Sequence, residues 1–511
     1  MFSYFHFLSG KRKKTDLPPH AQRAQVAREV GPLSFDAFPS YFPSQLIHSS
    51  SYSSELYSQL KEKLYGKELL LEELQVTKEE MVPFLKAGLI TARIGIQPRK
   101  KGYICLRCGT DDLSLFGSYP CARCQQTCIY CRNCIQMGKI STCTLLFRSH
   151  FPEETSFETY PQSENDILQW DGQLSLGQQK ASDKIVKAIE KRRELLVWAV
   201  CGAGKTEVLF HGMAHALKKQ FRVLLATPRT DVVLELLPRL RKVFPLTVIS
   251  GLYSASTEKH LPASIVVATT HQVMRFVDAF DVVIIDEVDA FPYSLDSSLK
   301  YAVAKAGKRE SATIYLTATP DPTLTSRVQQ KTLPAVKIPR RFHGHPLPVP
   351  KLSWCGNWER KLKQKEVPKQ VWEWCRVRIE SGTPVFLFVP SVTSLQQVTD
   401  ILKKLHPNIE GVHSADEERL TKVSAFREGT IPILVTTTIL ERGVTVPRVD
   451  VAVIGAEQDI FTESALVQIA GRAGRSHNHP TGDVVYFHYG VTAEMNKAIT
   501  HIKKMNNTPI R

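Results

Sequence analysis

Short runs of consecutive apolar residues recur along the chain from about residue 195 onward. They lie at 195–200, 223–226, 265–268, 282–285 and 313–316. Each run is too short for an amphipathic helix and lacks the alternation of a half-exposed strand. Continuous apolar runs of this length are typical of strands buried on both faces of a parallel sheet. The pattern therefore predicts an α/β fold, with helices between the strands.

A second set of apolar runs, at 385–389 and 433–435, predicts a second sheet of the same kind. The stretch 337–350 between the two sets holds four prolines and two histidines, which suits a hinge. We accordingly place one lobe at 166–340 and another at 346–511.

Hydrophobic patterning is weaker before the first lobe. Residues 15–55 are rich in Pro, Ser and His, so we expect residues 1–53 to form a poorly ordered tail or linker. Helical spacing with many Lys and Glu over 54–85 predicts one or two surface helices in a helical extension spanning 54–100. A cysteine-rich module is expected over 101–146.

The first apolar run leads into a small turn, Cys201-Gly202-Ala203-Gly204, followed by a lysine and a threonine. Its backbone N–H groups can approach phosphate oxygens closely. Lys205 can place its ammonium between the β- and γ-phosphates of ATP, and the Thr206 hydroxyl can ligate Mg²⁺. Ala199 stands where the usual first Gly would be, so a chance Gly-rich turn is the alternative for this segment alone.

An acidic pair ends the apolar run 282–285. Asp286 can hold Mg²⁺, and Glu287 can polarise the attacking water. Open α/β folds bind ligands at the carboxyl edge of the sheet, which is where both the acids and the phosphate loop are expected. Acidic residues also cap strands at protein surfaces, but the phosphate loop upstream favours nucleotide binding.

Further motifs follow in the order typical of superfamily 2 DExD/H helicases, which the chain resembles from about residue 168 to its end. The resemblance implies two RecA-like lobes with ATP between them. Gln178 resembles the glutamine that reads adenine. The segments 227–229 (TPR) and 269–271 (TTH) resemble loops that contact a phosphate backbone, and 317–319 (TAT) resembles the segment that couples hydrolysis to lobe movement.

The motif at 468–475 (QIAGRAGR) brings two arginines from the second lobe. Guanidinium groups that reach a γ-phosphate stabilise the charge of the transition state. Arg475 is our first choice for this role, with Arg472 beside it; an arginine-rich surface helix is the alternative. Short Thr and Ser side chains at strand ends suit sequence-blind phosphate contacts, which favour a translocase over a site-specific binder.

Eight of the eleven cysteines lie between positions 105 and 143. Repeated CxxC pairs are typical of zinc sites, because two thiolates on a tight turn share one tetrahedral metal. A disulfide framework fits poorly without a secretory signal. Spacing alone favours one ribbon of Cys105, Cys108, Cys121 and Cys124, with the surplus thiols able to complete a second site. Surrounding basic and aromatic residues suit contact with a DNA strand, and a purely structural module is the alternative.

The zinc module ahead of helicase lobes resembles the ComFA family, late-competence ATPases of bacterial DNA uptake. The likeness includes the segments 198–207 (WAVCGAGKTE), 286–293 (DEVDAFPY) and 437–446 (TTILERGVTV). This resemblance implies zinc ligands at Cys105, Cys108, Cys131 and Cys134, a pairing that differs from the one favoured by spacing. The roles of Cys121, Cys124, Cys128 and Cys143 stay open between a second site and replacement of one pair.

The same resemblance implies an ATPase that binds single-stranded DNA and helps to draw transforming DNA through a membrane channel. It implies a cytoplasmic location, with peripheral attachment at the inner face of the cell membrane left open. A phosphoribosyltransferase-like protein from the same operon is the implied partner, and a homo-oligomer is a further option.

Two other functions compete with this interpretation. A primosomal or recombination helicase of DNA repair or replication restart also carries zinc cysteines, but in that class they lie within the helicase lobes. A non-catalytic zinc DNA-binding scaffold is the other alternative. The presence of Lys205, Thr206, Asp286, Glu287 and Arg475 disfavours it, because a decayed ATPase site would usually lose one of them.

Charge and composition agree with a polyanion as partner. The net charge is +16 and the isoelectric point is near 9.3, which favours DNA but would also serve an anionic membrane. No stretch approaches about 18 uninterrupted apolar residues, so a membrane role is expected to be peripheral. The apolar residues 1–7 precede the basic run 11–14, the reverse of a signal peptide. We favour translated sequence upstream of the working start over a weak surface anchor.

Overall fold

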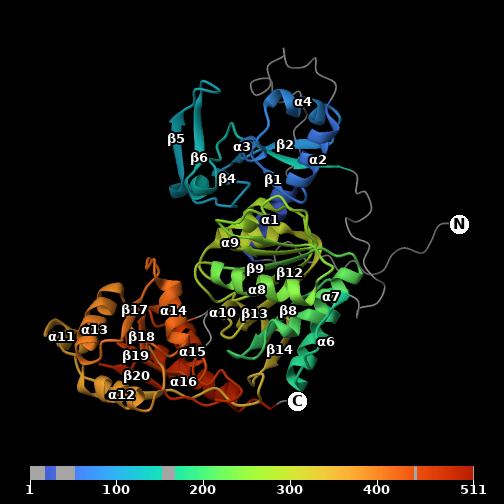
Figure 1. Cartoon of the computed structure of the whole chain (residues 1–511). Coiled ribbons are helices and arrows are strands. Elements are labelled where there is room, and N and C mark those ends of the chain that lie inside the picture. The colour runs from blue at the N-terminus through green and yellow to red at the C-terminus, as the bar shows by residue number, and fades with distance from the viewer. Residues whose placement is uncertain (1–17, 30–51, 152–166, 442–445, 510–511) are drawn as a thin grey trace.

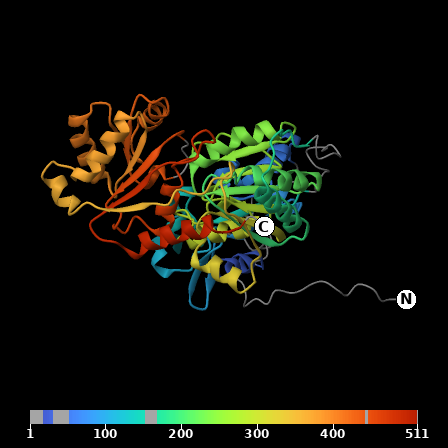
Figure 2. The same ribbon diagram turned by 90° about the horizontal axis from the view of Figure 1, so that it is seen from below.

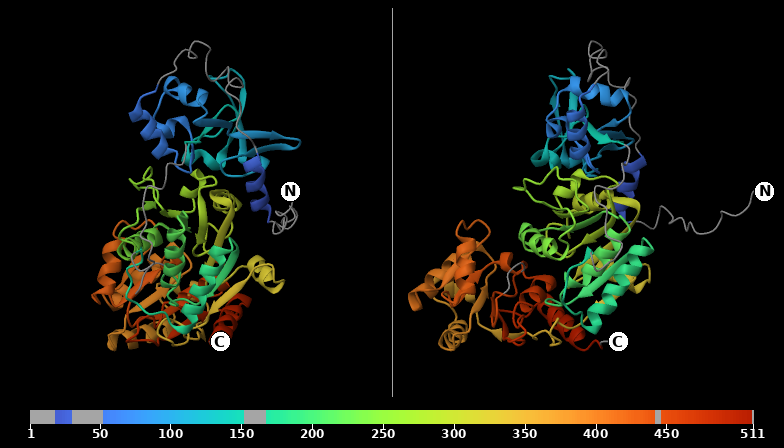
Figure 3. Two further views of the ribbon diagram at one scale, coloured as in Figure 1. Left: turned by 90° about the vertical axis from the view of Figure 1, so that its right-hand side faces the viewer. Right: turned by 45° about the vertical axis from the view of Figure 1, so that its right-hand side comes forward.

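The computed structural model describes residues 18–29, 52–151, 167–441 and 446–509. Three parts are visible in Figure 1: an N-terminal module, a first α/β lobe and a second α/β lobe. The module lies on one side of lobe 1 and lobe 2 on another, as Figure 3 also shows. Seen from below, lobe 2 extends sideways from lobe 1 (Figure 2).

Lobe 1 is built on a seven-stranded parallel sheet with the order β10-β11-β9-β12-β13-β8-β14. Every apolar run predicted in this region forms one of its strands. The strands are β8 (Glu194–Ala199), β9 (Val223–Thr227), β10 (Ile249–Leu252), β11 (Ile265–Thr269), β12 (Phe280–Ile285), β13 (Gly307–Thr317) and β14 (Ala335–Ile338).

Both faces of this sheet are buried, because alternate strand residues enter different apolar clusters. Leu225 and Ile284 pack with residues of the helices α6, α7 and α8, whereas Leu224 and Ile285 pack with residues of α9. This arrangement explains why the strands read as unbroken apolar runs. The helices are α6 (Leu176–Glu190), α7 (Phe210–Lys218), α8 (Thr230–Val243), α9 (Ser297–Ala306) and α10 (Pro322–Gln329).

Lobe 2 has a six-stranded parallel sheet with the order β15-β20-β19-β16-β18-β17. Its strands are β15 (Lys351–Trp354), β16 (Val385–Phe388), β17 (Glu410–Val412), β18 (Ile433–Thr436), β19 (Asp450–Ile454) and β20 (Val484–His488). Its helices are α11 (Trp358–Lys363), α12 (Lys369–Glu380), α13 (Val392–Leu405), α14 (Arg419–Arg427), α15 (Glu463–Ala470) and α16 (Ala493–Asn506). The α/β class and the two RecA-like lobes are as predicted.

The N-terminal module mixes helices and strands, whereas we expected a helical extension before the cysteines. A small antiparallel sheet with the order β1-β7-β2 joins residues on both sides of the cysteine-rich segment, and the strands of two hairpins, β3–β4 and β5–β6, contain Cys105, Cys128 and Cys131. The elements are α2 (Ser54–Lys63), β1 (Glu68–Leu69), α3 (Leu71–Leu74), α4 (Lys78–Lys86), β2 (Ile90–Ile94), β3 (Ile96–Arg99), β4 (Gly102–Cys105), β5 (Phe116–Pro120), β6 (Thr127–Cys131) and β7 (Leu145–Ser149).

The predicted poorly ordered tail contains a helix, α1 (Pro19–Glu29), which packs against α9 of lobe 1. Ala24 is buried there, and Arg23 forms an ion pair of 2.6 Å with Asp111. The apolar and basic segments at 1–7 and 11–14 lie outside the described residues. Within the described part of the chain, no helix combines the length and apolarity needed to cross a bilayer.

Candidate functional site

A cavity of about 260 Å³ lies between the carboxyl edge of the lobe 1 sheet and helix α15 of lobe 2. Residues that are distant in sequence line it together. From lobe 1 come Gly202, Ala203, Gly204, Lys205, Thr206, Asp286 and Glu287, and from lobe 2 come Gln468, Arg472 and Arg475. The structure thus brings the predicted lysine, threonine, acids and arginines into one space.

The phosphate loop needs glycine at two of its positions. Gly202 and Gly204 have φ angles of 76° and 70°, in the left-handed region that residues with a Cβ avoid. A Cβ at Gly204 would lie 2.4 Å from the Gln178 amide nitrogen. At Gly202, the side chains of Arg341 and Arg475 pack over the glycine face, at 3.7 and 3.6 Å from where a Cβ would stand.

Gln178 lies behind the loop and does not line the cavity. Its Nε2 donates to the Ala203 carbonyl over 2.9 Å, and its Oε1 accepts from the Ser175 backbone N–H over 2.8 Å. The side chain therefore ties the start of α6 to the phosphate loop. Its predicted contact with adenine stays a prediction, because both ends of the amide are engaged here.

The two acids stand directly after β12, at the edge where the sheet faces the phosphate loop. The Glu287 backbone N–H donates to Asp286 Oδ1 over 2.9 Å, and Glu287 itself has a φ of 55°. The Thr206 hydroxyl lines the same cavity. Hydroxyl and carboxylate oxygens beside a phosphate-binding turn form a donor set that fits Mg²⁺ bound with a nucleotide.

The two arginines follow α15 and bring positive charge to this cavity. Arg472 is buried, and its Nε donates to the Glu441 carbonyl over 2.8 Å. Burial, followed by the charge of Arg475, lowers the pKa of Arg472 well below its ordinary value. Arg475 lies against Gly202. Two crowded guanidiniums and a lysine make the cavity favourable for a polyanion, because bound negative charge relieves their repulsion.

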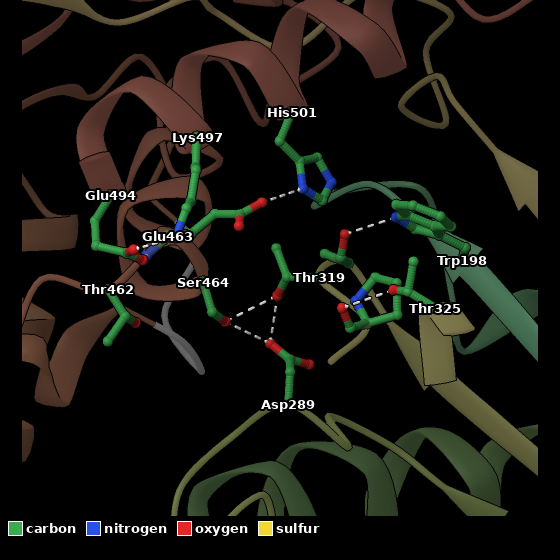
Figure 4. Close-up of polar contacts among 12 residues, drawn as sticks. Trp198, Asp289, Thr319, Thr325, Thr462, Glu463, Ser464, Glu494, Lys497 and His501 are labelled. Carbon is green, nitrogen blue, oxygen red and sulfur yellow. Dashed lines mark hydrogen bonds and ion pairs between the residues drawn. The ribbon is translucent and has the colours of Figure 1, made fainter. Parts of the chain in front are cut away.

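A polar cluster links the two lobes beside the cavity (Figure 4). Asp289, three residues after Asp286, accepts from Thr317 Oγ1 over 2.6 Å and from Thr319 Oγ1 over 2.7 Å. Ser464 of lobe 2 donates to the same Asp289 carboxylate over 2.8 Å and lies 2.8 Å from the Thr319 hydroxyl. The TAT motif (317–319) and Asp289, which follows the acidic end of β12, thus both contact lobe 2 at Ser464.

The expected phosphate-contact loops lie side by side, since the Thr270 N–H donates to the Thr227 carbonyl over 2.9 Å. Both threonines are, however, fully buried. Arg229 turns toward lobe 2 and donates to the Ile439 carbonyl over 2.6 Å. In this arrangement the two hydroxyls do not reach the surface, because each strand-end side chain points into the lobe. Arg442 and Gly443 of the segment 437–446, which carries part of the family likeness, lie outside the described residues.

Several residues at the cavity were not assigned a role from the sequence. Cys201 donates from its thiol to Gln468 Oε1 over 2.9 Å, so the phosphate loop touches α15 directly. Arg341 donates to the Gly474 carbonyl, and Phe342 lines the cavity. Glu207 and Arg239 form an ion pair at its rim. Gln468 lies inside a recognised motif, but the Glu207–Arg239 pair leaves no signal in the sequence.

The eight clustered cysteines form two groups of four. One contains Cys105, Cys108, Cys131 and Cys134, the other Cys121, Cys124, Cys128 and Cys143, and within each group all sulfur atoms lie within 4.8 Å of one another. The ribbon favoured by spacing, with Cys121 and Cys124 joining the first pair, is therefore not what the structure shows. The β5–β6 hairpin returns the chain to its starting point, which places Cys131 opposite Phe116 and beside the first CxxC turn.

The first group is fully enclosed and has the dimensions of a tetrathiolate site. Two sulfur–sulfur distances are 3.7 Å (Cys105–Cys134) and 3.6 Å (Cys108–Cys131); tetrahedral zinc with bonds of about 2.3 Å requires about 3.8 Å. Burial opposes ionisation of Cys105, but the neighbouring thiols hold its pKa well below the ordinary value, and the same hydrogen bonds raise the pKa of Cys134. A buried thiolate surrounded by thiols fits Zn²⁺.

The first cysteine group is joined to lobe 1 by a buried polar network. Lys305 of α9 donates to the carbonyls of Arg107 and Met274, each over 3.0 Å. The Tyr301 hydroxyl donates to the Leu106 carbonyl over 2.7 Å. All four cysteines belong to the same apolar cluster as strand and helix residues of lobe 1. The metal-binding turn is thus part of the packing of lobe 1.

Comparison with known proteins gives three family matches along the chain. The Competence protein ComFA N-terminal domain matches residues 51–148. The model described as Type III restriction enzyme, res subunit, matches residues 172–322, and the Helicase conserved C-terminal domain matches residues 366–477. The match to 51–148 contains all eight clustered cysteines, and the two others contain the phosphate loop, the acids and the arginines.

Two relatives are similar over most of their length. Competence protein ComFA of Bacillus subtilis (strain 168) is 47% identical over 458 residues, which cover 90% of this chain and 96% of that protein. Competence protein ComFA of Streptococcus pneumoniae (strain ATCC BAA-255 / R6) is 39% identical over 402 residues, 76% of this chain and 91% of that protein.

Among solved structures, S. cerevisiae Dbp5 bound to RNA and ADP BeF3 matches 65% of this chain and 92% of its own, with 16% identity and a TM-score of 0.46. The two helicase-type domain matches identify a helicase-type ATPase. Because the two competence proteins are 47% and 39% identical over nearly their whole length, the chain belongs to the ComFA family of competence proteins.

Proposed function

We propose that this protein is an ATP-driven translocase that moves single-stranded DNA during uptake of transforming DNA. The observation that supports it is the shared cavity of Lys205, Thr206, Asp286 and Glu287 from lobe 1 with Arg472 and Arg475 from lobe 2. Because the site is complete only when the lobes are together, each cycle of ATP binding and hydrolysis would open and close them.

The roles within the site follow from the chemistry of each group. Lys205 and the backbone N–H groups of 202–206 would hold the phosphates, while Thr206 and Asp286 would hold Mg²⁺. Glu287 would orient the attacking water and accept its proton. Arg475, with Arg472 beside it, would stabilise charge on the transferred phosphoryl group. Release of product would weaken the contact between lobes at the arginines.

The relative movement of the lobes would be transmitted to the DNA through a polar cluster that joins the end of β12 to lobe 2. This cluster consists of Asp289, Thr317, Thr319 and Ser464. The adjacent 227–229 and 269–271 loops would meet the phosphate backbone through main-chain N–H groups and the exposed His271. Such contacts carry no base information, so affinity should be nearly independent of sequence and should fall steeply with salt.

The first cysteine group would hold one structural Zn²⁺ and fix the module to lobe 1. We place the protein in the cytoplasm, where it would meet a phosphoribosyltransferase-like partner and the membrane DNA channel. Attachment to the inner face of the membrane would be peripheral. The net charge of +16 supports a polyanionic partner.

The test combines ATP turnover with strand movement. Wild type, Lys205→Ala, Asp286→Asn and the surface control Arg427→Ala are compared with single-stranded DNA, duplex DNA and RNA. Streptavidin displacement from biotinylated single strands, labelled at either end, measures translocation. We expect ATP-dependent displacement and single-strand stimulation in wild type and Arg427→Ala, and neither in the two site variants. Unstimulated turnover, or no displacement from either end, would contradict the proposal.

A further inference from the structure

The second cysteine group lies at the far end of the β5–β6 hairpin, which extends away from lobe 1 (Figure 1). Cys121 and Cys124 belong to the turn of this hairpin, Cys128 lies at the start of β6, and Cys143 comes from the segment after the hairpin. The sulfur–sulfur distances are 3.6 Å for Cys121–Cys143 and 3.3 Å for Cys124–Cys128. The four sulfurs therefore approach the edge of about 3.8 Å that tetrahedral zinc requires.

The CxxC turn of this group has the same backbone geometry as the turn of the first group. In the first, the N–H of Gly109 donates to the Cys105 carbonyl over 2.8 Å; in the second, the N–H of Gln125 donates to the Cys121 carbonyl over 2.8 Å. Gly109 and Gln125 both have positive φ angles, 72° and 55°. The return bonds, Cys105 N–H to Thr110 and Cys121 N–H to Gln126, are 3.0 and 2.9 Å.

This repetition is informative because Gln125 adopts a conformation that non-glycine residues rarely take. Its backbone repeats the turn that directs the first pair of thiolates toward one point. Two turns of different sequence, C-L-R-C-G and C-A-R-C-Q, thus converge on one metal-binding geometry.

Cys143, the fourth cysteine of the group, is positioned by hydrogen bonds between residues 140–142 and β6. The N–H of Cys131 donates to the Ile140 carbonyl, and the N–H of Thr142 donates to the Ile129 carbonyl, each over 2.9 Å. Residues 140–142 thereby run beside β6, with a bridge between Tyr130 and Ser141. This pairing carries Cys143 from the base of the hairpin back to its tip.

The tip has no apolar core to hold it. Cys121 and Cys128 are buried, whereas Ala122, Arg123 and the segment 125–127 around them are exposed. A folded tip of this size needs a covalent or metal cross-link. Two disulfides would require sulfur pairs at about 2.05 Å, but the structure instead brings all four sulfurs within 4.8 Å of one another.

We infer that Cys121, Cys124, Cys128 and Cys143 form a second structural zinc site, so that the chain binds two Zn²⁺ ions. The two sites share no ligand and are loaded independently. The first is built into the packing of lobe 1, whereas the second holds only the hairpin tip. Because Cys124 and Cys143 are half-buried, a chelator should remove the second ion before the first.

Metal content per chain tests this inference directly. The zinc content of full-length protein, purified under reducing conditions, is measured by inductively coupled plasma mass spectrometry. We expect two ions in wild type, one in the Cys121→Ser/Cys143→Ser double variant, and two in the control Cys355→Ser, which changes a buried cysteine of lobe 2 outside both groups. One ion in wild type, or two in the double variant, would overturn the inference.

Cobalt titration keeps the test valid if the double variant folds poorly. Metal-free wild type should take up two Co²⁺ per chain with the visible bands of tetrahedral thiolate sites. The single variant Cys143→His keeps a metal ligand and should retain two ions, whereas Cys143→Ala should lose one. Equal binding by both variants, or Cys121–Cys143 and Cys124–Cys128 disulfides in reduced preparations, would refute the second zinc site.

Discussion

Lobe 1 meets a neighbour on two faces, and the two contacts are built differently. Its module face, formed by α9 and residues 272–278, is filled by buried charges and carbonyls, with Lys305, Arg107 and Glu73 enclosed between the parts. Its cleft face, formed by the phosphate loop and the acids, surrounds a cavity of about 260 Å³.

The difference indicates which parts move together. Separating the module from lobe 1 would expose an apolar cluster and strip partners from buried charges, which is costly. Separating the lobes would part an apolar cluster to which both contribute and break hydrogen bonds such as that from Ser464 to Asp289, but around a space that a nucleotide can fill. We therefore expect the module to travel with lobe 1 as one body, and the ATP-driven movement to occur at the cleft face.

The largest effect is expected from removing the arginine at the cleft face. Arg475→Ala should lower DNA-stimulated ATP turnover by about 10³- to 10⁵-fold, because an arginine finger contributes that much to phosphoryl transfer. The melting temperature should be nearly unchanged. Steady-state ATPase and calorimetry measure both quantities, with Arg427→Ala as control; a loss below tenfold would place the transition-state arginine elsewhere.

The next effect probes the module face. Glu73 pairs with Arg107 at 3.0 Å and with Arg275 at 2.7 Å. Glu73→Ala would leave a buried guanidinium uncompensated and should cost about 3 kcal/mol in the free energy of unfolding. The neighbouring Glu72 forms an exposed ion pair with Arg123, with an N–O distance of 3.7 Å. As the matched control, Glu72→Ala should lower the free energy of unfolding by less than about 1 kcal/mol. If urea unfolding gave the same loss of unfolding free energy for both variants, the buried ion pairs of Glu73 would contribute no more than an exposed pair.

A buried lysine makes the module face sensitive to pH. Burial lowers the pKa of Lys67 to about 7, and its Nζ donates to the Lys259 carbonyl over 2.6 Å. The unfolded chain keeps this proton up to about pH 10.4, so the free energy of unfolding should rise with pH between about 7 and 10.

Lys67→Met should remove this slope, which for one group is at most about 1.4 kcal/mol per pH unit. Urea unfolding at pH 7, 8 and 9 measures the difference between the variant and wild type. The exposed Lys86→Met should keep the slope. A wild-type slope that persists in Lys67→Met would assign the pH dependence to other groups.

The smallest effect concerns the link between the lobes. Ser464→Ala removes the hydroxyl that lies between Asp289 and Thr319, a loss of about 1 kcal/mol. We expect basal ATP turnover to stay within twofold and stimulation by single-stranded DNA to fall about fivefold. Ser424→Ala, on the exposed face of α14, should leave both rates as in wild type; equal rates in Ser464→Ala would remove this cluster from the coupling.

The sequence could predict five strands of lobe 1 and two of lobe 2, though not β10, β14, β15, β17, β19 or β20. It could also predict residues of the cavity because these stand at the ends of predicted strands. Parallel strands share a carboxyl edge, so Lys205 and Asp286 had to meet there. Arg475 could be placed only through the helicase resemblance, since no local pattern shows that a distant lobe approaches. The contacts of Gln178 with the phosphate loop and the burial of Thr227 and Thr270 depend on side-chain direction, which apolar periodicity does not specify.

The N-terminal part was harder to predict for a different reason. Helix α1 has a polar composition without a strong apolar face, and packing against α9 stabilises it rather than its own propensity. The cysteine spacing was misleading because a hairpin inserted between two CxxC turns brings the later turn back to the earlier one. Distance along the chain then says little about which thiols meet.

The thiol in the phosphate loop offers a way to count openings of the molecule. Cys201 is buried against α15, bonded to Gln468 and next to Gly471. Because it lies at the contact with α15, an alkylating reagent should reach it faster while the lobes are apart. The labelling rate of this one sulfur during ATP turnover would therefore report how often the two lobes separate, with no dye or crosslinker added to the chain.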